Sequence, residues 1–181
     1  MDLTQGFNEK SSLALQAGFV QTVAVKLLEM NMTLDEIISQ RKSLAKTHVT
    51  KAVFPDTTHH HDTLFGGTAL QWMDEVSFIA ATRFSRQRIV TVSSDKIDFK
   101  HPVPAGSVVE LIAQVIEVGR TSLKVRVDMY VEDLYQDGCE KAITGVFSFV
   151  AIDENKQPTP VLPQDFIDLC IANNSATPLE Q

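Results

Sequence analysis

The chain lacks several features that define specialised classes of protein. Two cysteines among 181 residues do not make a disulfide framework, which favours a reducing cytoplasm. No apolar run reaches the roughly 20 residues that a membrane-spanning helix needs. The first residues, 1–4, lack the basic start of a secretory signal. We therefore expect a cytoplasmic protein with no membrane partner.

Basic residues are in the minority as well. The sequence has 16 lysines and arginines against 23 aspartates and glutamates, which gives a formal net charge of −7. A net acidic chain does not attract nucleic acid, so we expect none as a partner. Apolar residues, in contrast, make up 44% of the chain, which is enough for a real core and excludes a disordered protein.

The arrangement of the apolar residues divides the chain into three parts. Residues 1–46 form an expected helical extension, because apolar residues recur at helical spacing and Thr33 and Glu36 make a capping pair before a second helix. Residues 47–155 form the expected main domain. Residues 156–181 form a proline-containing tail with an expected short helix at 164–172.

The main domain has the pattern of one helix and one antiparallel sheet. Strands are expected at 48–54, 89–99, 107–118, 121–132 and 140–152, with one long helix at 66–84. The last four strands are joined by short turns, which implies antiparallel pairing. The apolar face of the helix comprises Ala69, Trp72, Met73, Val76, Ile79 and Ala80. We therefore predict an α+β fold in which a curved sheet wraps the helix and exposed strand edges favour dimerisation.

The start of the long helix carries the groups that would act on a substrate. A loop with three histidines, 59–61, leads into Gly66 and Gly67, where the first backbone N–H groups of the helix have no intrahelical partner. Such groups can hold a carbonyl oxygen. Asp74 follows about two turns later, between the apolar and polar faces, where it would be half-shielded. This layout indicates a hydrolase that acts on an activated acyl group.

Several motifs together resemble a known family. They are Thr-Leu-Phe-Gly-Gly at 63–67, Trp-Met-Asp-Glu at 72–75, Asp-Lys-Ile-Asp-Phe at 95–99 with Pro-Val at 102–103 and Gly106, and Gly-Arg-Thr-Ser at 119–122. Over roughly residues 47–155 the chain resembles acyl-CoA thioesterases of the hotdog fold, in the subgroup of short bacterial and related cytosolic enzymes.

The resemblance implies hydrolysis of acyl-CoA to a carboxylic acid and CoA, with no separate cofactor. It implies homodimers with a continuous sheet, often assembled as trimers of dimers, and active sites at the dimer interface. Asp74 matches the catalytic acid, as general base or nucleophile, and the Gly66 and Gly67 amides match the groups that face the thioester carbonyl. The turn of Arg120, Thr121 and Ser122 matches a segment near the CoA. We add Phe65 as a candidate substrate contact. Arg88 and Lys96 are further candidates, since half of the basic residues lie between 83 and 126.

Two residues depart from the family pattern. His59 stands where the family usually has asparagine, and Asp62 stands where it has glycine. His59 is a candidate catalytic residue, because it can donate a hydrogen bond in place of the asparagine or titrate near neutral pH.

Other interpretations of these residues remain open. Glu75 is the rival carboxylate, although its polar surroundings favour a solvated or structural role, and Cys139 lacks a histidine nearby. The histidines at 59–61 could bind a metal, but no zinc-like spacing supports this, and we expect no metal. An acyl-CoA-sensing repressor with an N-terminal helix-turn-helix is the main alternative function. Residues 1–46 are charge-neutral, which argues against it because a DNA-binding segment needs a basic face. A hotdog dehydratase would need a differently placed histidine.

Overall fold

A computed structural model describes residues 33–162 of the chain. Residues Ser39–Leu162 form one compact unit, and the description below concerns this unit and the helix that leads into it. The first 32 residues of the expected helical extension, 1–46, and the short helix expected at 164–172 lie outside the described residues. No helix among the described residues is long and apolar enough to cross a bilayer.

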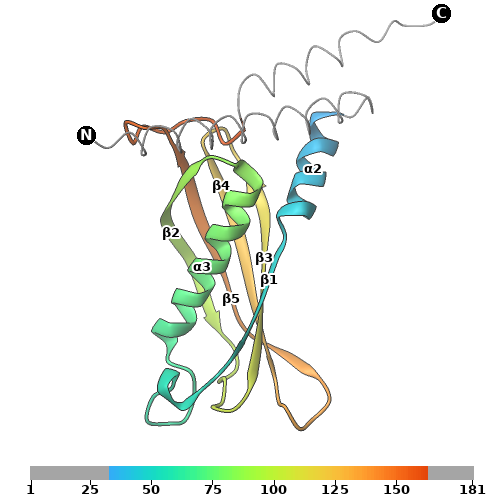
Figure 1. Ribbon diagram of the computed structural model, residues 1–181, viewed down its shortest axis with the longest axis vertical. Helices are drawn as coiled ribbons and strands as arrows, with labels where there is room; N and C mark the ends of the chain where they lie inside the picture. Colours follow the sequence, from blue (N-terminus) through green and yellow to red (C-terminus); the bar gives the residue numbers. More distant parts are fainter. Residues whose placement is uncertain (1–32, 163–181) are drawn as a thin grey trace, which may run out of the picture. The chain divides into compact units, whose positions relative to one another are not determined.

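The elements follow the order that the sequence predicts, as Figure 1 shows. They are α2 (Leu34–Ala45), β1 (Thr47–Ala52), the 3-10 turn η1 (Pro55–Thr57), α3 (Gly66–Ser85), β2 (Arg88–Phe99), β3 (Val108–Val118), β4 (Ser122–Glu132) and β5 (Cys139–Ile152). The five strands form one antiparallel sheet in the order β1-β3-β4-β5-β2. The predicted α+β fold, one long helix against an antiparallel sheet, is confirmed.

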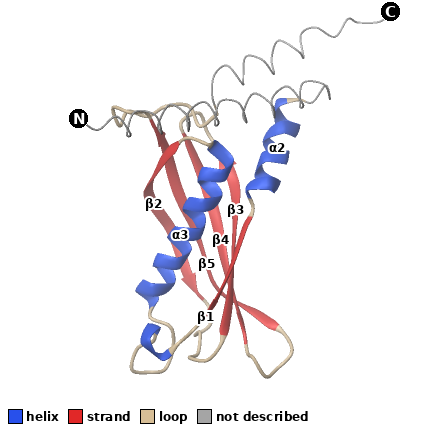
Figure 2. Cartoon of the chain, viewed as in Figure 1, coloured by secondary structure: helices blue, strands red, loops and turns tan. Residues whose placement is uncertain are grey.

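Helix α3 runs along one face of the sheet and packs against all five strands (Figure 2). Strands β3, β4 and β5 alternate as half-buried strands do, with about every second side chain buried. The core comprises Met73, Val76, Ala80 and Phe84 of α3 with Val109, Leu111, Val115, Leu123, Val125, Val127, Met129, Phe147 and Phe149 of the sheet. Ile79, which we expected on the buried face of the helix, is 37% exposed. The sheet therefore covers a narrower stripe of α3 than helical periodicity predicts.

Strand β2 is an open edge of the sheet. It pairs only with β5, so one row of its backbone N–H and C=O groups has no strand partner within the unit. Apolar side chains along it stay exposed, Val92 at 56% and Phe99 at 54%. An exposed apolar edge of this kind is a template for pairing with another strand.

The strand is also kinked near its end. The pairing with β5 shifts register between Asp95 and Asp98, and Lys96 has a positive φ of 23°. This bulge turns Ile97 inward, so that its Cδ1 occupies the place where a Cβ on Gly145 would stand. Glycine at 145 therefore makes room for the bulged strand.

Helix α2 is tied to the main unit through its basic side chains. Its start has the predicted capping box, in which the Thr33 backbone N–H donates to Glu36 Oε2 at 2.7 Å and the Glu36 N–H donates to Thr33 Oγ1 at 3.3 Å. Further along, Arg41 donates from Nε and Nη2 to the Phe84 carbonyl at 3.1 and 2.8 Å. A cation thus covers the carboxyl end of α3, where the helix dipole favours positive charge.

A polar cluster lies on the face of the sheet away from α3. Asp128 is 8% exposed, although strand alternation predicts a solvated position for it. Thr144 Oγ1 donates to its Oδ1 at 2.6 Å, and Lys141 Nζ lies 3.1 Å from its Oδ2. These neighbours from β5 cover the carboxylate. The hydrogen bond with Asp128 is the main cause that raises the pKa of Lys141.

Candidate active site

The start of α3 presents free backbone donors, as the sequence predicts. Phe65 precedes the helix without a side-chain cap, and the first intrahelical bond runs from the Ala69 N–H to the Phe65 carbonyl at 3.0 Å. The N–H groups of Gly66, Gly67 and Thr68 have no acceptor among the described residues. The first turn also contains no acidic side chain. The site can therefore receive a carbonyl oxygen that gains negative charge.

Glycine at 67 keeps this helix start open. A Cβ on Gly67 would stand 2.7 Å from Cε1 of Phe65, whose ring is 56% exposed and lies beside the helix start. A Cβ on Gly66 would meet only the ring of Phe99, at the ordinary contact distances of 3.6 Å for Cζ and 3.7 Å for Cε1. A side chain at 67 would push the exposed Phe65 ring aside, so glycine at 67 lets this ring lie against the helix start.

Asp74 lies half-buried on α3, as expected, and a second side chain holds it. Oγ1 of Thr91 on β2 donates to Asp74 Oδ1 at 3.0 Å. The bond fixes one carboxylate oxygen and leaves the other available. Thr91 could not be predicted as a site residue, because a threonine in a β-branched strand carries no signal that it faces a carboxylate on a helix 17 residues earlier.

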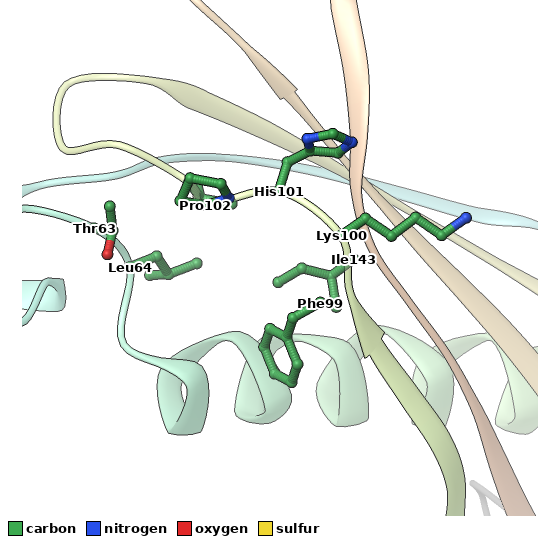
Figure 3. A pocket seen from close by; sticks show the side chains of 8 residues that line it. Thr63, Leu64, Phe99, Lys100, His101, Pro102 and Ile143 are labelled. Atoms are coloured by element: carbon green, nitrogen blue, oxygen red, sulfur yellow. The ribbon is translucent and has the colours of Figure 1, made fainter.

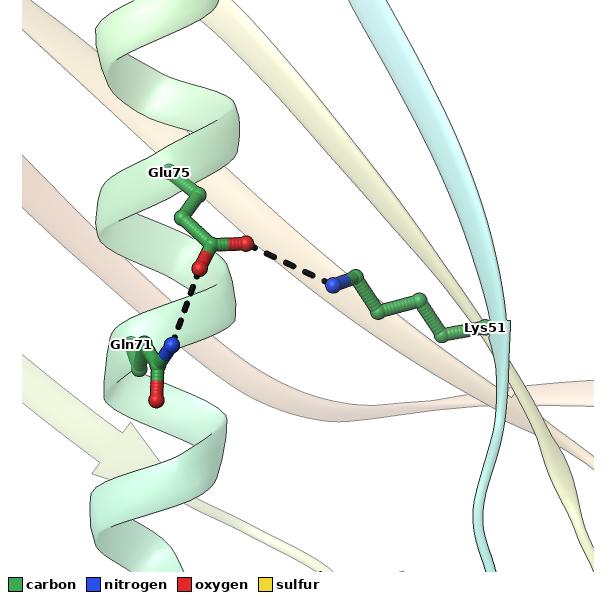
Figure 4. Close-up of polar contacts among 3 residues, drawn as sticks. All are labelled: Lys51, Gln71 and Glu75. Carbon is green, nitrogen blue, oxygen red and sulfur yellow. Dashed lines mark hydrogen bonds and ion pairs between the residues drawn. The ribbon is translucent and has the colours of Figure 1, made fainter.

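Glu75 has the polar surroundings that its place on the helix predicts. Its carboxylate lies 3.4 Å from Lys51 Nζ of β1 and accepts from Gln71 Nε2 at 3.0 Å, as Figure 4 shows. Its side chain is 49% exposed. Lys51 also lies over the ring of Trp72, 5.0 Å from the centroid. This surface network ties α3 to β1 and leaves Asp74 as the shielded carboxylate.

The histidine loop is held by its own residues. The His61 backbone N–H donates to His59 Nδ1 at 3.1 Å, and His59 Nε2 lies 2.9 Å from Thr63 Oγ1. Asp62 has a φ of 55°, in the left-handed region that favours glycine, so aspartate here keeps a glycine-like bend. Among the described residues, no group of three or more His, Cys, Asp or Glu side chains is arranged to hold a metal ion.

A small pocket of about 190 Å³ lies beside the helix start (Figure 3). Its lining residues come from the loop before α3, the end of β2 and β5; they are Thr63, Leu64, Phe99, Lys100, His101, Pro102, Val103 and Ile143. The walls are mostly apolar, and the ring of His101 pairs outward with Glu140, with Nε2 3.1 Å from Oε1. The pocket can shield a bound group from water next to the free N–H groups.

Within one chain, the candidate CoA contacts lie towards opposite ends of the sheet. Arg88 begins β2 and pairs with Ile152, while the turn of Arg120, Thr121 and Ser122 lies at the same end of the sheet, where Ser122 pairs with Val150. Lys96 lies in the bulge towards the other end, with Nζ 3.7 Å from Asp98 Oδ2. Phe99, beside Gly66, pairs with Ile143. From Ile143 to Val150 a strand spans about 23 Å.

Comparison with known proteins identifies relatives of this architecture. The thioesterase superfamily matches residues 61–136. An uncharacterized acyl-CoA thioester hydrolase of Zymomonas mobilis is 37% identical over 61% of this chain and 74% of its own. A hexameric thioesterase of Yersinia pestis is similar in structure, with a TM-score of 0.59 and 30% identity over 64% of this chain and 93% of its own.

An acyl-CoA hydrolase of Staphylococcus aureus, solved with butyryl coenzyme A, coenzyme A and coenzyme A disulfide, has a TM-score of 0.65. It is 29% identical over 74% of this chain and 87% of its own. Its solved structures include variants in which an asparagine, an aspartate and a threonine are each replaced by alanine. The chain described here therefore belongs to the hotdog-fold thioesterase superfamily, among the acyl-CoA thioester hydrolases.

Proposed function

We propose that this acyl-CoA thioester hydrolase uses Asp74 as the general base or nucleophile and the N–H groups at Gly66 and Gly67 as its oxyanion site. The observation that carries the proposal is the hydrogen bond from Thr91 to Asp74, on the helix that begins with those free N–H groups. The products would be a carboxylic acid and CoA, and CoA would enter only as part of the substrate.

The comparison with the Staphylococcus aureus enzyme supports the choice of residues. The asparagine, aspartate and threonine replaced there have the same spacing along their chain as His59, Asp74 and Thr91 have here. Two of the three residue types are the same, and these two are hydrogen-bonded to each other in this structure. His59 takes the place of the asparagine.

The distance along α3 supports a site shared between two subunits. Asp74 lies seven residues after Gly67, which is about 10 Å along the helix axis. A reacting carbonyl must lie about 3 Å from both the attacking group and the donors. Asp74 and the free N–H groups of one chain are therefore too far apart to act on the same thioester. Asp74 of one subunit and the N–H groups of its partner can act together if the two α3 helices lie antiparallel.

Pairing of two β2 edges would create that arrangement. In an antiparallel twofold pair, the Arg88 end of one β2 lies beside the Phe99 end of the other. Asp74 and Thr91 of one subunit then approach the free N–H groups of its partner. The turn of Arg120, Thr121 and Ser122 comes from the same end as Arg88, so we propose these residues for CoA together with the partner's Phe65 and Lys96. The exposed apolar side chains of β2 support such a dimer.

A pair of neighbouring carboxylate variants tests the proposal. Asp74→Asn keeps the shape of the side chain but removes the base, and we expect kcat for butyryl-CoA hydrolysis to fall by about 10²- to 10⁴-fold. Glu75→Gln is the matched control, because Glu75 is an exposed carboxylate on the same turn. Release of free CoA thiol is the readout. A fully active Asp74→Asn enzyme would end the assignment.

Mixed subunits test whether the site is shared. Asp74→Asn and Gly67→Ala each damage one half of the proposed site, the second because its Cβ meets the Phe65 ring. A mixed dimer contains one chain of each variant. If the two halves of a site come from different chains, one of its two sites has both halves intact. Co-expression should then restore part of the activity, and equally inactive mixed and single variants would place both halves in one chain.

A further inference from the structure

We infer that the hydroxyl of Thr63 is a substrate-binding donor for the thioester carbonyl oxygen, and that His59 is a positioning residue that orients it. The inference rests on the proposed function and adds two roles to it. It also gives a physical reason for histidine at position 59, which has the spacing of the asparagine replaced in the Staphylococcus aureus enzyme.

The hydrogen bonds of His59 determine which nitrogen carries its proton. A backbone N–H can only donate, so Nδ1 must offer its lone pair to the N–H of His61, 3.1 Å away. A neutral ring then carries its proton on Nε2, which points at Thr63 Oγ1 at 2.9 Å. Thr63 Oγ1 is therefore the acceptor of this bond, and its own hydroxyl proton is left to donate elsewhere.

No acceptor for that proton exists within the described part of the chain. Thr63 Oγ1 has a single hydrogen bond there, the one from His59. The residue is half-buried and lines the 190 Å³ pocket. Figure 3 shows Thr63 and Leu64 across that pocket from Phe99 and Ile143. A donor beside apolar walls interacts more strongly with a carbonyl oxygen than the same donor in water.

The backbone holds Thr63 at a fixed place before the helix. Its carbonyl accepts from the His59 N–H at 3.0 Å, and the next residue, Leu64, donates to the Val103 carbonyl at 2.8 Å. On the other side, the Asp62 carbonyl accepts from the Ala105 N–H at 2.8 Å. Thr63 stands three residues before Gly66, so its hydroxyl and the free N–H groups belong to one short segment. Such preorganised donors need no rearrangement as negative charge develops.

The direct test removes the hydroxyl and keeps the shape. Thr63→Val should lower kcat for butyryl-CoA by about 100-fold, the effect of losing one oxyanion donor, while the inhibition constant of free CoA stays unchanged. Thr63→Ser, which keeps the hydroxyl, should stay close to the wild type. Thr58→Val is the matched control in the same loop, because the Thr58 hydroxyl already donates to the Pro55 carbonyl at 2.8 Å.

A double variant tests whether His59 acts through Thr63. His59→Ala should lower kcat in the wild-type background and change it little in the Thr63→Val background, because the group that it orients is already gone. A merely structural role would instead lower kcat in both backgrounds. Melting temperatures of all variants are compared, and Thr63→Ala replaces Thr63→Val if the valine variant does not fold.

The outcomes separate this inference from the proposed function. A wild-type protein that hydrolyses no acyl-CoA would end the proposed function. An active wild type with a Thr63→Val variant as active as Thr58→Val would end only the inference. A raised KM with unchanged kcat, together with weaker binding of free CoA, would place the hydroxyl on an amide carbonyl of the CoA arm and overturn the thioester assignment.

Discussion

Arg41 ties α2 to the carboxyl end of the long helix, and its removal should destabilise the whole unit. Its guanidinium makes two short N–H bonds to the Phe84 carbonyl, next to the end of α3 at Ser85. The charge lies over the Phe84 ring, with Cζ of Arg41 5.9 Å from the centroid. Burial, and to a lesser extent the nearby Arg86, lowers the pKa of Arg41. The guanidinium therefore loses part of its hydration at this position.

The magnitude follows from these contacts. A hydrogen bond from a charged group contributes about 1.5–3 kcal/mol, and a cation at a helix carboxyl end adds about 0.3–1 kcal/mol. The loss of Arg41 solvation and the apolar contacts of a methionine in its place offset part of this sum. We expect Arg41→Met to lower the free energy of unfolding by about 2 kcal/mol. For a chain of this size that corresponds to a fall in Tm of about 4–8 °C.

Thermal unfolding followed by circular dichroism measures the effect, and Lys42→Met is the matched control. Lys42 is the neighbouring cation on α2 and also donates to one backbone carbonyl, Ile116 O at 3.0 Å, but it is exposed. Its loss should cost within about 0.5 kcal/mol. Equal Tm values for the two variants would refute the claim that the buried contact stabilises α3. Arg41→Met should keep its activity well below its Tm, because Arg41 has no part in the proposed chemistry.

Two further predictions concern Thr91 and Asp128. Thr91→Val removes the hydrogen bond to Asp74 but keeps the shape, so kcat/KM should fall about 10- to 100-fold at unchanged Tm, and a variant as fast as the wild type would contradict the role of Thr91. Asp128 raises the pKa of Lys141, so this contribution to stability is complete below the unfolded pKa of about 10.4 and is lost as pH rises through the higher folded value. Asp128→Asn should reduce that alkaline loss, because Asp128 is the largest cause of the raised pKa. Unfolding midpoints measured between about pH 9 and pH 12 check it.

The main elements could be predicted because their signals are local. The apolar stripe of α3, the alternation in β3, β4 and β5, and the Thr33–Glu36 capping pair depend on residues a few positions apart. The errors arose where distant segments decide burial. Ile79 has a helical apolar position but is 37% exposed. Asp128 has a polar strand position but is covered by Lys141 and Thr144 of the next strand.

The sequence by itself determined the family, the order of the elements and the candidate groups at Gly66, Gly67 and Asp74, because short motifs and periodicity are properties of neighbouring residues. Only the tertiary structure decided which side chains meet. It set Thr91 against Asp74, turned His59 towards Thr63 and left the edge of β2 open. It also separated the helix start from the Arg120 turn by the length of the sheet. The physical reason is that strand register and helix packing bring together residues far apart in sequence, and no local pattern encodes those distances.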